Sequence, residues 1–397
     1  MTDADQPETH VPHPPESADR PDARFVAPGE AVVRLIPPSQ PRSTVREIFV
    51  GPDGLRAGWS LLLYAILLFV LLFGSRSLVH TLRHHPAVAQ QNAAAQSRTQ
   101  PSKPTAPAPS APAPPIIVIG GEAISLFAVA VATWLMATIE RQPTSAFGLG
   151  GKRRMHNFLA GLGWGVALLS LLVFSLRACG LLVFDARLLF GVEALRFGAV
   201  WFVGFLLVGL FEEYFFRGYL QFTLARGING IYGWLGAGGP RATGRRSTEL
   251  SKTGQRATTQ AALGYWTAAL LLSFGFGFGH SSNAGESPIG LLAAGLVGMV
   301  FCLSLWRTGS LWWAIGFHAA WDWAQSFLYG AADSGMVIQG RLFSAHPVGR
   351  PVFSGGLTGP EGSLLILPII ALTAAVILLT LPPAATTCPQ ARATSLD

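Results

Sequence analysis

Eight apolar segments, each about as long as a bilayer core is thick, constrain this chain more than any other feature. A helix needs about 20 residues to cross roughly 30 Å of hydrocarbon. Only 12% of the residues are charged, against about 25% in soluble domains. We therefore predict an all-α, polytopic transmembrane helical bundle of about eight helices. The segments are Trp59–Ser75, Ile116–Ile139, Phe158–Phe174, Phe197–Ala225, Ala262–His280, Ile289–Trp306, Leu311–Tyr329 and Leu364–Leu381.

Polar sequence surrounds and interrupts this bundle. Residues 1–55 are rich in Pro and have no apolar period, and we expect a disordered cytoplasmic tail there. The transmembrane domain is expected over 56–385, followed by a second disordered tail over 386–397. Residues 76–115 form an external linker that is rich in Ala and Pro from residue 86. No short apolar segment with a cleavage site opens the chain, so we expect no removable signal peptide.

The distribution of Lys and Arg predicts the orientation of the bundle. With the N-terminus inside, eighteen Lys and Arg fall on the inner side and nine on the outer side, and Arg217 lies within a helix. Cytoplasmic loops carry such an excess, so both termini should be cytoplasmic. The net charge of +7 then reflects topology and contact with anionic lipid, and we expect no nucleic-acid partner. We expect an integral multi-pass protein of a bacterial inner membrane.

The fourth apolar segment carries three charged residues where charge is costly. An ionisable side chain at the bilayer centre costs about 2.5 kcal/mol or more on insertion scales. Glu213 and Arg217 are i and i+4, so they share a helix face and can pair as structural support. Glu212 points about 100° away and has no such partner. It is therefore a candidate to take a proton from water.

Two histidines also fall in apolar segments. His280 ends an alternating Gly-Phe run, whose glycines permit either a close backbone approach or a helix break. His318 precedes Asp322 by four residues, so the two face the same way. Together with Glu212, these groups can activate a water molecule and stabilise an oxyanion, as peptide hydrolysis requires. They could equally hold a divalent metal through two imidazoles and a carboxylate.

Other sequence signatures exclude several alternatives. The three cysteines, Cys179, Cys302 and Cys388, have no metal-type spacing, which argues against a disulfide framework and against a Cys-based zinc site. The sequence also lacks the signatures of other intramembrane proteases, namely His-Glu-x-x-His, Gly-x-Ser-Gly and Gly-x-Gly-Asp.

Three motifs in the apolar segments now stand in a recognisable order. They are Glu-Glu-x-x-x-Arg at 212–217, Phe-x-x-x-His at 276–280 and His-x-x-x-Asp at 318–322. This order resembles the CAAX-protease and bacteriocin-processing (CPBP) family of intramembrane endopeptidases, which includes type II prenyl-protein proteases. The resemblance covers about residues 200–330.

The resemblance implies a helical bundle with its site sunk into the membrane and a catalytic core over residues 197–330. It implies that Glu212 activates the water together with His280. It also implies that His318 and Asp322 bind the substrate carbonyl or a metal.

Further expectations follow from the same resemblance. Glu213 and Arg217 would hold the site together. If a metal is bound, zinc is the candidate, and its ligands would be His280, His318 and Asp322; a metal-free mechanism stays open. Many family members have Asn where this chain has Asp322, and Asn can donate a hydrogen bond to an oxyanion, whereas an ionised Asp cannot.

We therefore predict an intramembrane endopeptidase that hydrolyses peptide bonds of a membrane-associated protein or peptide at the lipid bilayer. Two other classes stay open. A proton- or ion-coupled transporter also places Glu and His in the membrane, but it would more often show related halves, which we do not find. A non-catalytic membrane scaffold would keep its phenotype in Glu212→Gln, whereas a protease would lose it.

Overall fold

The computed structural model describes residues 48–51, 54–83, 112–236, 250–283 and 285–382. The chain divides into two units, 1–46 and 47–397, and every described residue belongs to the second. That unit is a helical bundle, as the apolar segments predict. Most of the predicted tail over 1–55, most of the external linker and the predicted tail over 386–397 lie outside the described residues.

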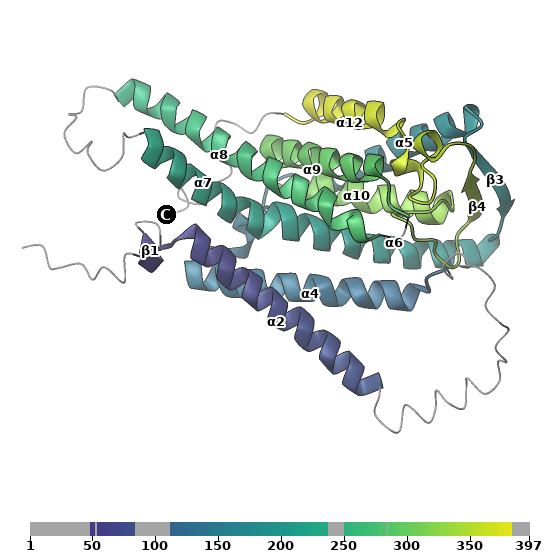
Figure 1. Cartoon of the computed structure of the whole chain (residues 1–397), viewed down its shortest axis with the longest axis horizontal. Coiled ribbons are helices and arrows are strands. Elements are labelled where there is room, and N and C mark those ends of the chain that lie inside the picture. The colour runs from purple at the N-terminus through teal and green to yellow at the C-terminus, as the bar shows by residue number, and fades with distance from the viewer. Residues whose placement is uncertain (1–47, 52–53, 84–111, 237–249, 284, 383–397) are drawn as a thin grey trace, which may run out of the picture. The chain divides into compact units, whose positions relative to one another are not determined.

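The helices of the bundle run side by side in alternating directions (Figure 1). Those that correspond to the predicted segments are α2 (Ala57–Arg83), α4 (Pro115–Glu140), α5 (Arg154–Ala178), α6 (Gly191–Glu213), α7 (Gln221–Gly236), α8 (Leu250–Gly279), α9 (Pro288–Thr308), α10 (Trp312–Trp323) and α12 (Ile366–Thr380). Short helical turns lie between them. Those of 3-10 or π-helical type are η1 (Thr144–Ala146), η2 (Tyr214–Leu220), η4 (His280–Ser282), η5 (Ala324–Leu328) and η6 (Pro360–Gly362); the short α-helix α11 (Pro351–Ser354) precedes η6.

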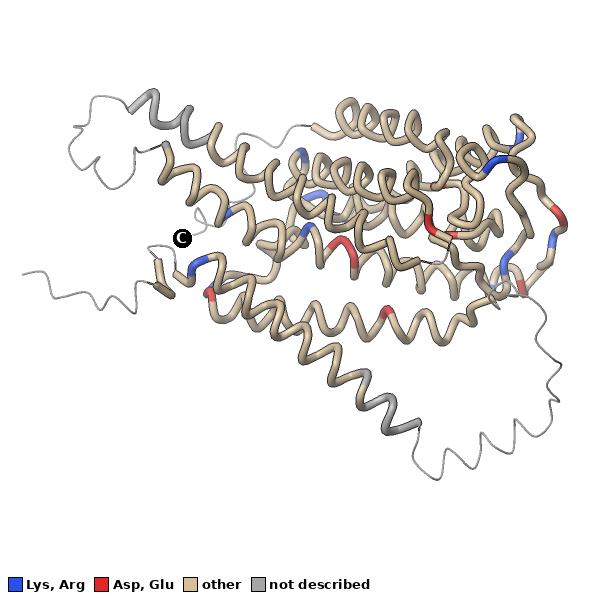
Figure 2. The backbone as a smooth tube through the Cα atoms, in the orientation of Figure 1, with Lys and Arg blue, Asp and Glu red and all other residues tan. Residues whose placement is uncertain are grey.

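Within the described part of the chain, six helical stretches are long and apolar enough to cross a membrane. They are Ala57–Ser75, Pro115–Glu140, Arg154–Ala178, Gly191–Leu235, Thr259–Ser282 and Pro288–Thr308. Large apolar side chains such as Phe69, Phe127 and Phe274 are mostly exposed on these helices, as a lipid-facing surface requires. Figure 2 shows helices that are largely free of charge along their length, with charged residues concentrated towards their ends. The chain is an integral membrane protein.

Two of the eight predicted segments form helices that are too short to cross a membrane by themselves. The segment Leu311–Tyr329 becomes α10, with 12 residues, and continues in the π-helical turn η5. The segment Leu364–Leu381 becomes α12, with 15 residues. Hydropathy measures only apolar length. It therefore registers neither the π-helical winding that follows α10 nor the non-helical ends of the segment that forms α12.

The long fourth segment is not one straight helix. It runs through α6, the π-helical turn η2 and α7, and Gly218 inside the turn has non-helical angles of φ −85° and ψ −118°. A π-turn or an inserted kink of this kind is a recognised cause of bending. The bend follows directly after Glu212 and Glu213, so the helix changes its winding where the motif places its charges.

Glycines bring α5 and α10 into close contact. A Cβ atom at Gly161 would lie 2.2 Å from the carbonyl oxygen of Trp313, and one at Gly165 would lie 2.5 Å from that of Phe317. On α10, a Cβ at Gly316 would lie 2.2 Å from the carbonyl oxygen of Phe158. Small residues allow helix backbones to approach in this way inside a membrane. These contacts fix the position of α10, which carries His318.

The fifth segment extends further than its apolar run indicates. Helix α8 begins at Leu250 rather than near Ala262, and it continues through the Gly-Phe run to Gly279. The glycines of this run allow α8 to pack closely against α9 and do not break the helix. A Cβ atom at Gly277 would lie 2.6 Å from the carbonyl oxygen of Leu291 on α9. His280 then begins the 3-10 turn η4 at the end of this helix.

Two small strand pairings were not predicted. Strand β1 (Val50–Gly51) pairs with β2 (Gly54–Leu55) inside the stretch that we assigned to the disordered tail, so these two strands correct that assignment. Strand β3 (Leu182–Arg187) pairs antiparallel with β4 (Phe343–Pro347) and joins two distant loops at one end of the bundle (Figure 1). A strand is indicated by alternating apolar and polar residues, but a run of five or six residues between long apolar segments is too short to show this pattern clearly.

Candidate active site

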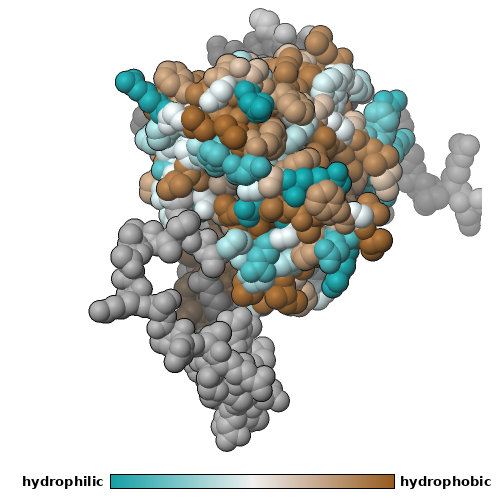
Figure 3. Space-filling view, turned by 90° about the vertical axis from the view of Figure 1, so that its right-hand side faces the viewer, coloured by the Kyte–Doolittle hydropathy of each residue, from teal (hydrophilic) through white to brown (hydrophobic). Residues whose placement is uncertain are grey.

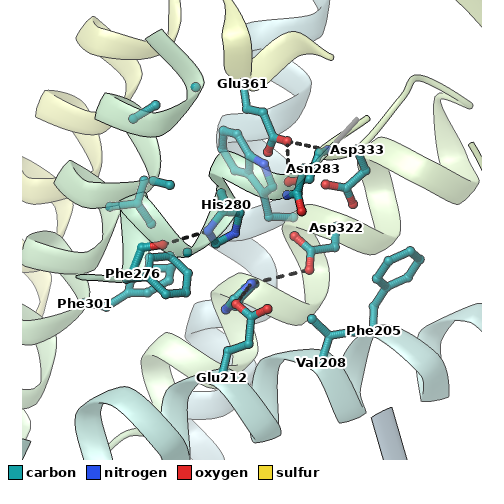
Figure 4. Close-up of a pocket in the computed structure, with 18 of the residues that line it drawn as sticks. Phe205, Val208, Glu212, Phe276, His280, Asn283, Phe301, Asp322, Asp333 and Glu361 are labelled. Carbon is teal, nitrogen blue, oxygen red and sulfur yellow. Dashed lines mark hydrogen bonds and ion pairs between the residues drawn. The ribbon is translucent and has the colours of Figure 1, made fainter. Parts of the chain in front are cut away.

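A cavity of about 570 Å³ lies between the helices of the bundle and collects the predicted site residues. Glu212 from α6, His280 from η4, and His318 and Asp322 from α10 all line it. Its remaining wall is mainly apolar and aromatic, including Phe205, Phe216, Phe276, Phe301 and Ile369. Figure 4 shows Glu212, His280 and Asp322 around a common space. Three separate motifs of the sequence thus meet in one pocket.

Glu213 lies behind this pocket at the centre of a buried polar chain. Its Oε1 atom is 3.0 Å from Nη1 of Arg217 and 3.0 Å from Nδ1 of His318. The side chains of Glu213 and Arg217 are almost fully buried. The Arg217 guanidinium also lies 4.3 Å from the ring centre of Phe276, a cation–π distance. Glu213 therefore links the α6 turn to the histidine on α10.

The contact with Glu213 fixes how His318 presents its ring. An ionised carboxylate can only accept hydrogen bonds, so Nδ1 of His318 donates to Glu213 and Nε2 is left for the pocket. Nε2 lies 3.6 Å from Oε2 of Glu212 and 3.5 Å from Oδ2 of Asp322. Both distances exceed a normal hydrogen bond, so these groups are gathered around Nε2 without being bonded to it. The adjoining cavity of about 570 Å³ is large enough to hold water beside these groups.

His280 is oriented by its own helix. Its Nδ1 atom lies 2.8 Å from the backbone oxygen of Phe276. A carbonyl oxygen can only accept, so Nδ1 is the donor and Nε2 keeps a lone pair in the neutral ring. The ring of Phe276 packs against the imidazole, with 4.7 Å between ring centres. The Phe-x-x-x-His spacing thus places both the bonding carbonyl and the packing ring one helical turn before the histidine.

A metal centre would need at least three ligand side chains arranged around one point. Within the ranges that the structure describes, no three His, Cys, Asp or Glu side chains are arranged so that they could hold a metal ion. His318 and Asp322 approach each other, but the predicted set of His280, His318 and Asp322 does not form a ligand cage in this arrangement. The residues as placed do not fit a resident zinc ion, and we derive no step through one.

Several pocket residues escaped the sequence analysis. Glu122 lines the pocket from α4, and it is the only charged residue between Pro115 and Ile139. A lone carboxylate in an apolar segment is the signal that singled out Glu212, and it could have identified Glu122 too. Asp333 and Glu361 also line the pocket, but they come from loops that carry no such signal.

Those two loop carboxylates are held in place by hydrogen bonds. Ser334 donates to Oε1 of Glu361 through its backbone nitrogen at 2.6 Å and through its hydroxyl at 3.0 Å. Ser326 donates to Oδ2 of Asp333 at 2.9 Å. Burial raises the pKa of Asp333 well above its usual value, and the nearby charges of Asp322 and Glu361 raise it further. Burial likewise raises the pKa of Glu361.

A comparison with protein families agrees with the motifs. The model of the Rce1-like family, described as type II CAAX prenyl endopeptidase Rce1-like, matches residues 194–324. This match confirms the resemblance to CAAX proteases, and it covers about a third of the chain, including all three motifs. It supports protease activity in general. Comparisons with curated proteins and with solved structures find no match.

The matched segment does not contain the whole pocket. Glu122 precedes it, and Asp333 and Glu361 follow it. The matched segment therefore supplies Glu212, His280, His318 and Asp322, whereas part of the wall comes from sequence outside the match.

Proposed function

We propose that this protein is an intramembrane endopeptidase that hydrolyses a peptide bond of a membrane-associated protein or peptide. One observation carries the proposal. His318 is held by Glu213 through Nδ1 and faces Glu212 and Asp322 with Nε2, in a cavity whose wall is mainly apolar. A histidine that is fixed on one nitrogen by a carboxylate and free on the other is typical of acid–base sites.

The proposed reaction needs one water molecule and the protein's own groups. Glu212 accepts a proton from the water, while Nε2 of neutral His280 accepts a hydrogen bond that orients it. The water oxygen bonds to the peptide carbonyl carbon, and the carbonyl oxygen gains the negative charge. Nε2 of His318, when protonated, donates a hydrogen bond to that oxyanion. Glu212 then returns the proton to the leaving nitrogen as the carbon–nitrogen bond breaks.

The other two classes gain less support from the pocket. A transporter needs a path through the bundle, but the lining residues come from the middle of the helices and from one end only. A scaffold does not require two histidines together with the helix carboxyl groups of Glu122, Glu212 and Asp322 around one cavity, because each such group is costly to place inside a membrane bundle.

Glu212→Gln is the decisive experiment. The change keeps the shape of the side chain but removes the proton acceptor, so we expect turnover to fall by about 10² to 10⁴, the usual contribution of acid–base catalysis. Membrane peptides from cells with wild-type and variant protein would be compared by mass spectrometry, and the folded yield of both would be measured. Glu193→Gln is the matched control, since Glu193 is exposed in the first turn of the same helix.

Near-normal activity of well-folded Glu212→Gln would defeat the assignment. An unchanged peptide profile together with a retained phenotype would favour the scaffold.

A further inference from the structure

The candidate pocket belongs to one end of the bundle. Apart from helix interiors, its lining comes from three places at the end where β3 and β4 pair. These are the first turn of α4, the turn between α8 and α9, and the long connection between α10 and α12. Among the residues that the structure describes, none that lines the pocket lies in the connections at the opposite end, which join α4 to α5, α7 to α8 and α9 to α10.

Charge distinguishes the two ends. At the end away from the pocket, the connection from α4 into the start of α5 carries Lys152–Arg154, and the sequence between the start of α7 and residue 256 carries six further Lys and Arg. The pocket end carries fewer Lys and Arg in the sequence, and the charged lining residues there are acidic: Glu286, Asp333 and Glu361. No Lys or Arg is among the residues that line the described pocket. An excess of Lys and Arg marks cytoplasmic loops.

The pocket end also presents polar groups to solvent. Figure 3 views this end and shows hydrophilic residues gathered among hydrophobic ones across its face. His346 and Asp185, which pair across β3 and β4 at 2.7 Å, are both exposed here. Such a face suits an aqueous boundary rather than the hydrocarbon core.

From these features we propose that the pocket is entered from the non-cytoplasmic side of the membrane. The position of the entrance does not depend on the proposed protease function; only the substrate class rests on that function. The substrate is then a peptide segment presented at the outer face: the extracytoplasmic juxtamembrane part of a membrane-anchored protein or peptide. Apolar side chains of that segment fit the wall formed by Phe205, Phe276 and Phe301. A prenylated C-terminus in the cytoplasm would face the wrong end.

Thiol labelling in intact cells tests the entrance directly. Cys179 is exposed at the pocket end, and Asn283→Cys places a thiol in the pocket lining itself. Ser145→Cys is the matched control at the opposite end, where Ser145 is exposed in η1. Each is studied as the accessible cysteine in the full chain, with Cys179 and Cys388 replaced by Ser where needed and the buried Cys302 retained.

The reagent is a membrane-impermeant maleimide, applied before and after permeabilisation. We expect Cys179 and Asn283→Cys to react in intact cells as fully as in permeabilised cells. Ser145→Cys should react only after permeabilisation. The reverse pattern would overturn the inference and place the pocket at the cytoplasmic face.

The labelling experiment gives a clear answer even if the pocket cysteine is unreactive or the protein is inactive. If Asn283→Cys reacts under neither condition, Cys179 still decides the sidedness, because it lies at the same end. The labelling pattern does not depend on catalysis, so an inactive protein can support the entrance and an active one can refute it. Failure of the proposed protease is seen separately, in the Glu212→Gln comparison.

Discussion

The buried pair of Glu213 and Arg217 allows a quantitative test of how the site is held together. Glu213→Gln keeps the size of the side chain but removes the negative charge, so Arg217 is left without a counter-ion at a position where only 2% of its side chain is exposed. Breaking a buried pair in this way costs about 3–5 kcal/mol, because one charge stays buried and unpaired. The Phe276 ring, 4.3 Å from the guanidinium, offsets part of that loss, since a desolvated cation–π contact contributes up to about 2 kcal/mol.

The pair should therefore behave as a unit in a double-mutant cycle. Glu213→Gln and Arg217→Met should each destabilise the bundle by about 3 kcal/mol, while the double variant should lose clearly less than the sum, because no lone charge remains. Glu213→Gln should also lower turnover, since Glu213 holds Nδ1 of His318 at 3.0 Å.

Equilibrium unfolding of the purified protein in denaturing detergent measures the cycle, with the exposed Glu193→Gln as a control that should unfold like wild type. Additive single losses would refute the paired arrangement. So would a Glu213→Gln variant that unfolds within about 1 kcal/mol of wild type, since the expected loss is several times larger.

Three other predictions follow from the same structure. Asp322→Asn should keep turnover within about tenfold of wild type, because an amide can donate to an oxyanion; stoichiometric zinc in the wild type that is lost together with activity would contradict this. Asp333 has a raised pKa when folded, so the folded state retains a proton that the unfolded state releases near pH 4, and wild-type stability falls as the pH rises above that value. Asp333→Asn should accordingly have the higher Tm at pH 7 and a matching Tm at low pH; equal Tm values at both would count against a buried carboxyl. Gly165→Ala should cost about 1–3 kcal/mol through overpacking against Phe317, whereas Gly163→Ala, with open space at its Cβ, should not, and equal losses in thermal unfolding would rule out the close helix contact.

The sequence by itself determined the class of fold and four of the ionisable groups that meet in the pocket. Apolar length and the shortage of charge predict membrane helices, because an unpaired backbone cannot cross hydrocarbon. The cost of an ionisable group in that setting also singled out Glu212, His280, His318 and Asp322. These inferences are local: each depends on a few neighbouring residues and on helical spacing, and no knowledge of packing is needed.

Only the tertiary structure decided how those groups face one another. The link from Glu213 to His318 joins residues 105 positions apart, and helical spacing says nothing about a partner on another helix. The same holds for the π-turn after Glu213, and for the loop carboxylates Asp333 and Glu361 in the pocket wall. Spacing within one helix fixes which residues share a face, but packing between helices fixes which faces meet, and here glycine contacts such as Gly165 against Phe317 determine that packing.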